Sequence, residues 1–83
     1  MAMKFYTYCH IRLDTGKIFY IGKGSGKRLY SKTHRNLWWK NITNKTKYVA
    51  EILSYWASEE DAFIHEKFLI SILPNLVNQT FVS

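Results

Sequence analysis

The chain has 83 residues, a single cysteine and a net charge of +6, from 12 Lys and Arg against 6 Asp and Glu. This length fits one small domain spanning residues 1–83, and the lone Cys9 excludes an intramolecular disulfide or a zinc site built from thiolates. No apolar run reaches membrane-spanning length and no signal-peptide core is present, so we expect a cytoplasmic protein with no membrane partner.

A β-hairpin is predicted at the start of the chain. Phe5–Arg12 alternates and is rich in aromatic and β-branched residues, as strands are. Asp14–Lys17 has the composition of a turn, and Ile18–Gly22 is expected to return as the second strand.

A glycine-rich turn follows the hairpin, with glycines at positions 22, 24 and 26. Glycines allow a positive φ or a close approach of the backbone to a ligand. Ser25 can cap a helix that places Lys27 and Arg28 in its first turn, where cations oppose the helix dipole unless an anion is bound. The segment therefore indicates a phosphate site, and the alternative is a flexible hairpin exit with solvated basic residues.

A basic block without any acid runs from Thr15 to Ala50 and holds nine of the twelve Lys and Arg, interleaved with Tyr and Trp. Positive charge combined with aromatic faces is typical of a nucleic-acid surface. A membrane surface is less favoured because no long amphipathic helix is present. The side chains expected to contact nucleic acid are Lys27, Lys32, Arg35, Lys40 and Trp38.

Two short helices, a strand, a longer helix and a tail complete the predicted layout. The sum is an α+β domain with a three-stranded antiparallel sheet flanked by helices. In chain order these elements are helices over Ser25 to about His34 and Asn36 to about Asn44, a strand over Tyr48–Trp56, a helix from the capping box at Ser58 to about Leu73, and an extended tail over Leu76–Val82.

A carboxylate stands in the apolar face predicted for the last helix. Glu66 lies at helical spacing among the apolar residues Ala62, Phe63, Leu69, Ile70 and Leu73. A carboxylate in such a place needs a cation. It is interpreted as a divalent-metal ligand at the edge of a cleft, with a salt bridge to Arg28 or a place at the rim of the face as the alternatives.

Five residues in this order resemble the GIY-YIG nuclease family over nearly the whole chain: Tyr8 in Thr7-Tyr8-Cys9, Tyr20 in Tyr20-Ile21-Gly22, Arg28, Glu66, and Asn78 in Leu76-Val77-Asn78. Tyr6 is the alternative for the first tyrosine, since Tyr6-Thr7-Tyr8 replaces Gly-Ile-Tyr. The family's His one turn after the Arg is missing, because Ser31 and Lys32 occupy those positions and His34 comes too late. His10 and Lys23 are therefore further candidates for the group that removes a proton from water.

The resemblance implies a DNA endonuclease that uses Mg²⁺, or Mn²⁺, held by Glu66. It implies that Arg28 grips the scissile phosphate, that Tyr8 and Tyr20 position the attacking water, and that Asn78 orients a tyrosine or the phosphate. Without the resemblance, both tyrosines would be interpreted as packing residues of a hairpin. The competing function is a non-catalytic nucleic-acid-binding module on the same scaffold.

The chain has no room for a separate recognition domain, so we expect low specificity, a homodimer or a targeting partner. A second apolar stripe on the last helix, Ile64, Phe68 and Ile72, is a candidate dimer surface. The alternative is that the region around Trp56 or the C-terminal tail covers it.

Overall fold

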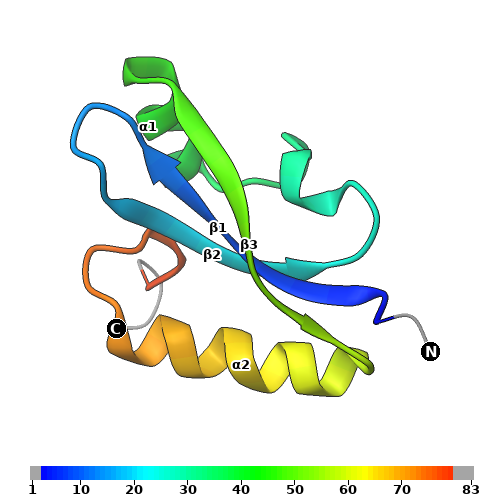
Figure 1. The fold of residues 1–83 in the computed structure, drawn as a ribbon. Helices are drawn as coiled ribbons and strands as arrows, with labels where there is room; N and C mark the ends of the chain where they lie inside the picture. The colour runs from blue at the N-terminus through cyan, green and yellow to red at the C-terminus, as the bar shows by residue number, and fades with distance from the viewer. Residues whose placement is uncertain (1–2, 80–83) are drawn as a thin grey trace.

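The computed structural model describes residues 3–79, which form an α+β fold around a three-stranded antiparallel sheet in the order β2-β1-β3 (Figure 1). The strands and main helices lie close to their predicted places. Ser58 caps the last helix as predicted, by accepting a hydrogen bond from the Asp61 backbone N–H at 3.1 Å. The elements are β1 (Phe5–Arg12), β2 (Ile18–Gly24), the 3₁₀ turn η1 (Arg28–Tyr30), α1 (Leu37–Lys45), β3 (Tyr48–Trp56), α2 (Glu59–Ile72) and the 3₁₀ turn η2 (Val77–Gln79).

The two faces of the sheet are covered differently, as Figure 1 shows: α2 lies along one face, and α1 with η1 lies on the other. Alternation along β1 sends Tyr6, Tyr8 and His10 to the α1 side, where Tyr6 and Tyr8 pack against Leu29. Cys9 lies on the α2 side in a cluster with partly buried side chains of that helix. The central strand therefore supplies both cores.

Helix α2 is anchored to the sheet by a polar contact. The Thr7 hydroxyl and His65 Nδ1 share a hydrogen bond of 2.8 Å, and Trp56 Nε1 donates to the same hydroxyl at 3.4 Å. Thr7 is fully buried, so this bond satisfies its hydroxyl inside the protein.

A bulge in β2 sets the direction of its aromatic residues. His10 pairs with Tyr20 and Ile11 with Ile18, which makes Phe19 the extra residue. Phe19 is buried against Trp39, while the half-buried Tyr20 stacks on His10 at 5.4 Å. Both aromatic rings therefore lie on the α1 side of the sheet.

The helix predicted over Ser25 to about His34 is wrong, because only the three residues of η1 are helical. Tertiary contacts override the local propensity: the Tyr6 hydroxyl donates to Gly26 O at 2.8 Å and accepts from Leu29 N at 3.0 Å. Positive φ values at Gly26 (57°) and His34 (58°) also interrupt a helix.

The extended tail predicted over Leu76–Val82 is corrected in part, because Val77–Gln79 forms η2. Residues 80–82 lie outside the described range. Helix α2 ends at Ile72, close to the predicted end at about Leu73, and Asn75 follows it with a positive φ of 62°. Leu76 is buried among Cys9 and Ile21, so the segment after α2 is held by the core.

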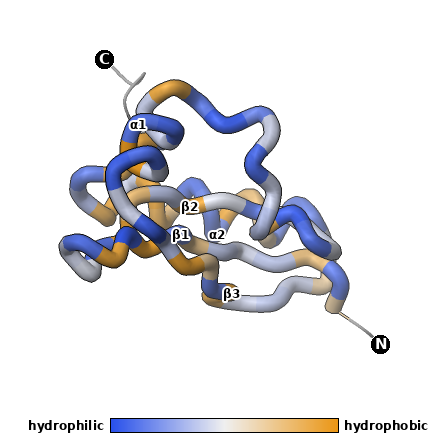
Figure 2. Tube along the Cα trace, turned by 90° about the horizontal axis from the view of Figure 1, so that it is seen from above, coloured by the Kyte–Doolittle hydropathy of each residue, from blue (hydrophilic) through white to orange (hydrophobic). Residues whose placement is uncertain are grey.

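The segment between β2 and α1 contains hydrophilic stretches, which Figure 2 shows in blue, seen from above. Neither helix in the described part of the chain has the length and apolar character needed to cross a bilayer.

On α2, the predicted stripe of Ile64, Phe68 and Ile72 is exposed at 60%, 56% and 56%. Trp56 lines a hollow together with Ile64 and Phe68, but both of these side chains remain more than half exposed within residues 3–79.

Candidate functional site

Two glycines of β2 make room for predicted site residues on the α1 side. Gly22 pairs with Tyr8, and a Cβ at Gly22 would lie 2.5 Å from the Tyr8 hydroxyl oxygen. A Cβ at Gly24 would lie 2.5 Å from Cγ of Arg28. Both separations are too short for real atoms, so only glycine allows Tyr8 and Arg28 to lie flat on the strand.

Arg35 connects the predicted residues, although it was predicted as a nucleic-acid contact. It is only 5% exposed, so it lies inside the protein and not on the expected surface. Its Nη1 donates to the Tyr8 hydroxyl at 2.8 Å and its Nη2 to Arg28 O at 3.2 Å, while Nε donates to Ser31 O at 2.9 Å. The guanidinium also lies 4.8 Å from the Tyr20 ring centroid.

Tyr8 and Tyr20 are neighbours, with ring centroids 6.2 Å apart. Burial raises the pKa of the Tyr8 hydroxyl, and the hydrogen bond from Arg35 opposes that rise. Tyr6, the alternative first tyrosine, uses its hydroxyl to hold the turn at Gly26, as described above. The hydroxyl that lies beside Tyr20 and Arg35 is therefore that of Tyr8.

His10 does not have the surroundings of a proton acceptor for water, which corrects the prediction. It is fully buried; Nε2 donates to Leu29 O at 2.8 Å, and Nδ1 accepts from Trp39 Nε1 at 2.9 Å. Burial lowers the pKa of its imidazole to about 4. Both ring nitrogens are occupied, so His10 is a neutral part of the core.

Glu66 and Lys23 lie on the α2 side of the β2 edge. Glu66 is half-buried, and burial raises the pKa of its carboxyl, opposed by the charge and the backbone of Lys23. Within residues 3–79 Glu66 forms no ion pair, so the alternative salt bridge to Arg28 is not present. The Lys23 ammonium pairs instead with Glu59 at 3.1 Å, and Phe63, predicted in the buried face, is 45% exposed.

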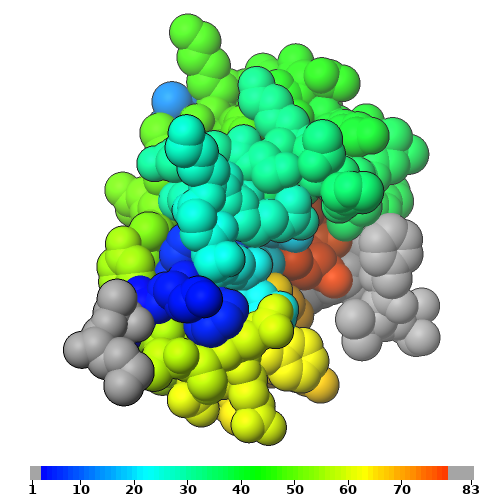
Figure 3. Space-filling view, turned by 90° about the vertical axis from the view of Figure 1, so that its right-hand side faces the viewer, coloured from blue at the N-terminus to red at the C-terminus, as the bar shows by residue number. Residues whose placement is uncertain are grey.

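These groups flank the glycine-rich end of β2 from its two sides. Tyr8, Tyr20 and Arg28 lie on the α1 side, and Glu66 reaches the backbone of Lys23 from the α2 side. In Figure 3, the turn after β2 (cyan) and the first half of α2 (yellow) border the same face of the molecule. We call this the β2-end site; it consists of Tyr8, Tyr20, Arg28, Arg35 and Glu66.

Within residues 3–79 the Asn78 amide bonds to the backbone of Ile21 and to no tyrosine hydroxyl. Its Oδ1 accepts from Ile21 N at 2.9 Å and its Nδ2 donates to Ile21 O at 2.8 Å. The amide thus pairs with the edge of β2 as a neighbouring strand would. Asn78 secures the strand one residue away from Tyr20.

The other predicted nucleic-acid contacts, Lys27, Lys32, Lys40 and Trp38, are all exposed. Lys32 also lines an open hollow of about 490 Å³ whose lining includes Lys45, Lys47 and Tyr48 and no acid. This surface is continuous with the segment that carries Arg28 and Arg35, and its charge suits a polyanion.

Sequence reasoning missed that Arg35 belongs to the site. One signal was present: Arg28 and Arg35 are the only arginines among the nine basic residues between Thr15 and Ala50. A planar guanidinium makes several directed hydrogen bonds that lysine does not. The two arginines lie at the site, and the lysines outside it are mostly exposed.

Glu66 is the one carboxylate among the five residues of the β2-end site. No group of three His, Cys, Asp or Glu able to hold a metal ion occurs in the described part of the chain. Glu66 alone suits Mg²⁺, which keeps most of its waters and commonly binds through one or two carboxylates plus substrate phosphate oxygens. A carboxylate that forms no ion pair within residues 3–79 and whose pKa is raised by burial fits such a weak site.

No family model, no curated protein and no solved structure matches the chain.

Proposed function

We propose that this protein is a metal-dependent endonuclease of the GIY-YIG type that hydrolyses DNA phosphodiester bonds with one active site per chain. The observation that carries the proposal is the convergence of Tyr8, Tyr20 and Arg28 beside two obligatory glycines, with the unpaired Glu66 on the other side of the same strand. The basic surface next to the site would bind the DNA, and we place the activity in the cytoplasm.

Arg28 has the donors needed to hold a phosphate. One of them, on Nη1, makes a long bond of 3.5 Å to Thr33 O, and its other guanidinium donors make no hydrogen bond within residues 3–79. The stem is fixed against Gly24, so the planar fork is presented in a limited range of directions. A bidentate contact with the scissile phosphate would stabilise the charge that develops there.

The two tyrosines are the groups left to handle the attacking water, because both ring nitrogens of His10 are bonded inside the core and the Lys23 ammonium is paired. Tyr8 itself is only 1% exposed. Tyr20 is half-buried and stacks on His10, which fixes its ring. A Mg²⁺ or Mn²⁺ ion held by Glu66 would stabilise the pentacoordinate phosphate and the leaving oxygen. Tyr8 and Tyr20 would orient the water and accept its proton.

The same facts favour one alternative, a nucleic-acid-binding module without catalysis. With only one carboxylate and no free histidine at the β2-end site, the scaffold could keep its basic surface and carry out no chemistry. In that case Tyr8 and Tyr20 are packing residues and Arg28 is one more phosphate contact. The two functions differ in a single observable, the breakage of a phosphodiester bond.

Supercoiled plasmid with Mg²⁺ tests the proposal, with EDTA and Mn²⁺ as parallel reactions. We expect open circles first at limiting protein, since one active site cuts one strand, and linear product that rises steeply with protein concentration. A homodimer through the exposed stripe of α2, or a targeting partner, would then supply the second cut. DNA binding with no cleavage under any of these ions would establish the binding module instead.

A further inference from the structure

Arg35 is a buried cation that pairs with no carboxylate among residues 3–79. The ion pairs within residues 3–79 are Arg12–Asp14 and Lys23–Glu59, and neither involves it. Removing a guanidinium from water is costly unless other groups replace its hydration. A buried charge kept without a counter-ion calls for a group that can balance it.

The contacts of Arg35 identify that group. Ser31 O and Arg28 O are neutral acceptors, and Tyr20 and Trp39 offer ring faces, at 4.8 Å and 5.6 Å from the guanidinium. The Tyr8 hydroxyl accepts from Nη1 at 2.8 Å inside the protein. Among the three atoms that accept a hydrogen bond from Arg35, only the Tyr8 oxygen can lose a proton and carry a full negative charge next to the guanidinium.

We propose that Arg35 is a positioning residue of the β2-end site, which holds the Tyr8 hydroxyl and the backbone of Arg28 together and stabilises a Tyr8 phenolate. This inference rests on the proposed function. In the step it serves, Tyr8 first releases its proton to solvent, and the phenolate then takes a proton from the attacking water. The water oxygen bonds to phosphorus, the bond to the leaving oxygen breaks, and that oxygen is protonated by solvent.

Among the groups around Tyr8, Arg35 is the one that lowers the pKa of its hydroxyl most. Burial raises the pKa of Tyr8 and so does the neighbouring Tyr20, whereas Arg35 and, more weakly, Arg28 lower it. His10 stays neutral above a pH of about 4. Removing Arg35 should therefore raise the pKa of Tyr8. The side chains that face Tyr8 are Tyr6 and His10 of β1, Tyr20 of β2, Ile52 of β3, and Arg28 and Arg35 of the segment after β2.

The first test is single-turnover cleavage of plasmid against pH by Arg35→Gln and Arg35→Lys. We expect a loss of roughly 10²–10³-fold for Arg35→Gln, as for other charge-stabilising groups, a rising limb of the profile displaced to higher pH, and partial recovery with added guanidinium. Affinity for DNA should stay within about twofold, because a buried side chain releases no counter-ions on binding. Arg12→Gln is the matched control and should leave rate and profile unchanged.

Two results would overturn the proposal. A weaker affinity with an unmoved pH profile would make Arg35 a surface contact. Lower thermal stability with an unmoved profile would make it a packing residue only.

In a double-mutant cycle, Tyr8→Phe combined with Arg35→Gln should be no slower than Tyr8→Phe alone, since both remove the same interaction.

A measurement without activity separates this inference from the proposed function. In wild-type protein with ¹⁵N-labelled arginine, the Arg35 Nη signals should shift as Tyr8 ionises, and Tyr8→Phe should abolish that step. This holds even if Arg35→Gln does not fold or if the wild type cuts no DNA. Arg35 Nη signals whose chemical shifts do not change during the alkaline titration would contradict the proposal, whatever the outcome of the plasmid assay.

Discussion

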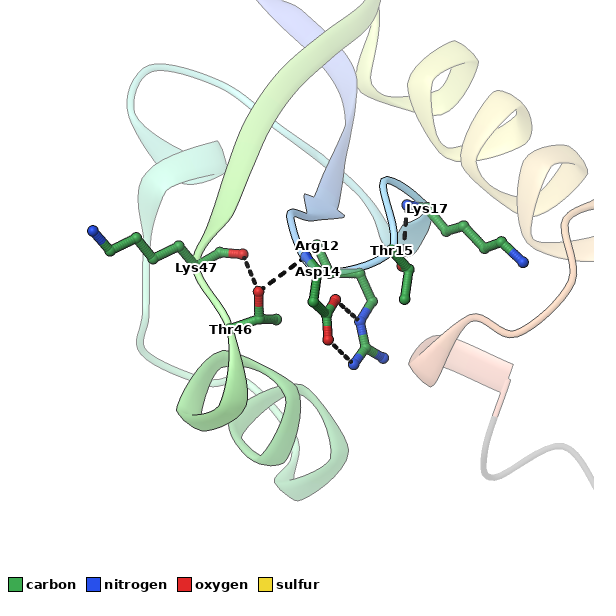
Figure 4. A network of polar contacts seen from close by, with 6 residues as sticks. All are labelled: Arg12, Asp14, Thr15, Lys17, Thr46 and Lys47. Atoms are coloured by element: carbon green, nitrogen blue, oxygen red, sulfur yellow. Dashed lines mark hydrogen bonds and ion pairs between the residues drawn. The ribbon is translucent and has the colours of Figure 1, made fainter.

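Two arginines at different places in the fold show opposite ways to hold a charge. At the hairpin turn, Arg12 forms a two-point pair with Asp14, through Nε at 2.7 Å and Nη2 at 2.8 Å, within the exposed network of Figure 4. At the β2-end site, Arg35 is buried and has no carboxylate within residues 3–79. The exposed pair is screened by water and replaceable. The buried, unpaired charge opposes folding and is therefore where we place chemistry.

The largest expected effect is that of replacing Glu66, which extends the comparison from the two arginines to a half-buried carboxylate. We expect Glu66→Gln to lower Mg²⁺-dependent cleavage by roughly 10³-fold or more, because it removes the proposed metal ligand and keeps the volume. Without metal the variant should be as stable as wild type or more stable, since burial raises the pKa of this carboxyl and its ionised form opposes folding.

Glu59→Gln is the matched control, because Glu59 is exposed and paired with Lys23. It should leave cleavage within about twofold. Plasmid assays and thermal melts in EDTA provide both readings. A large fall in melting temperature for Glu66→Gln, with activity retained, would show that the carboxylate is structural.

Arg28→Lys should reduce single-turnover cleavage by about 10²-fold, because lysine keeps the charge but loses the planar fork. Lys40→Ala and Lys45→Ala should instead weaken DNA binding, each reducing the salt slope of log K by about one. Binding isotherms at several salt concentrations separate the two effects. Near-normal turnover by Arg28→Lys would remove Arg28 from the active site.

The third prediction concerns the neutral histidine beside Arg35. The pKa of His10 is about 4 when folded and near 6.5 when unfolded, so between these values the unfolded chain binds the extra proton. Stability should therefore fall as pH drops from 6.5 to 4, by about 2–3 kcal/mol. Urea unfolding across this range measures it.

His10→Gln should lower stability at neutral pH and flatten that dependence. His34→Asn, at an exposed position whose positive φ suits Asn, should keep the wild-type slope. An unchanged slope in His10→Gln would assign the pH dependence to other groups.

The smallest effect belongs to Arg12. Arg12→Gln breaks the exposed pair, and Asp14 then loses the partner that lowers the pKa of its carboxyl. We expect a small change in the urea midpoint that disappears in 1 M salt, where screening is nearly complete. A clear, salt-independent loss would show that the hairpin network matters as much as the buried site.

Much of the fold followed from local patterns. The strands over Phe5–Arg12 and Tyr48–Trp56 have the predicted ends, because alternation and turn residues act over a few positions. The helix expected from Ser25 failed for the opposite reason. Its residues satisfy their backbone groups through the Tyr6 hydroxyl, which lies 20 residues away from Gly26 in sequence.

The sequence predicted which residues form the site better than it predicted the contacts between them. The structure brings Tyr8, Tyr20 and Arg28 to one side of β2, but alternation could not show that both nitrogens of His10 would be used inside the core. Nor could composition separate Arg35 from the exposed lysines around it, since burial depends on the packing of the whole segment.

The bulge at Phe19 has a consequence for how this chain tolerates changes in length. The hairpin carries one residue more in β2 than a regular ladder would need, and the bulge absorbs it before Tyr20. An insertion in the exposed turn at positions 13–17 would leave Tyr8 opposite Gly22. A deletion of Gly22 would bring Ile21 or Lys23 opposite Tyr8, and a side chain would replace glycine beneath the Tyr8 hydroxyl. Natural or engineered length variants should therefore accumulate at the turn and be absent at Gly22.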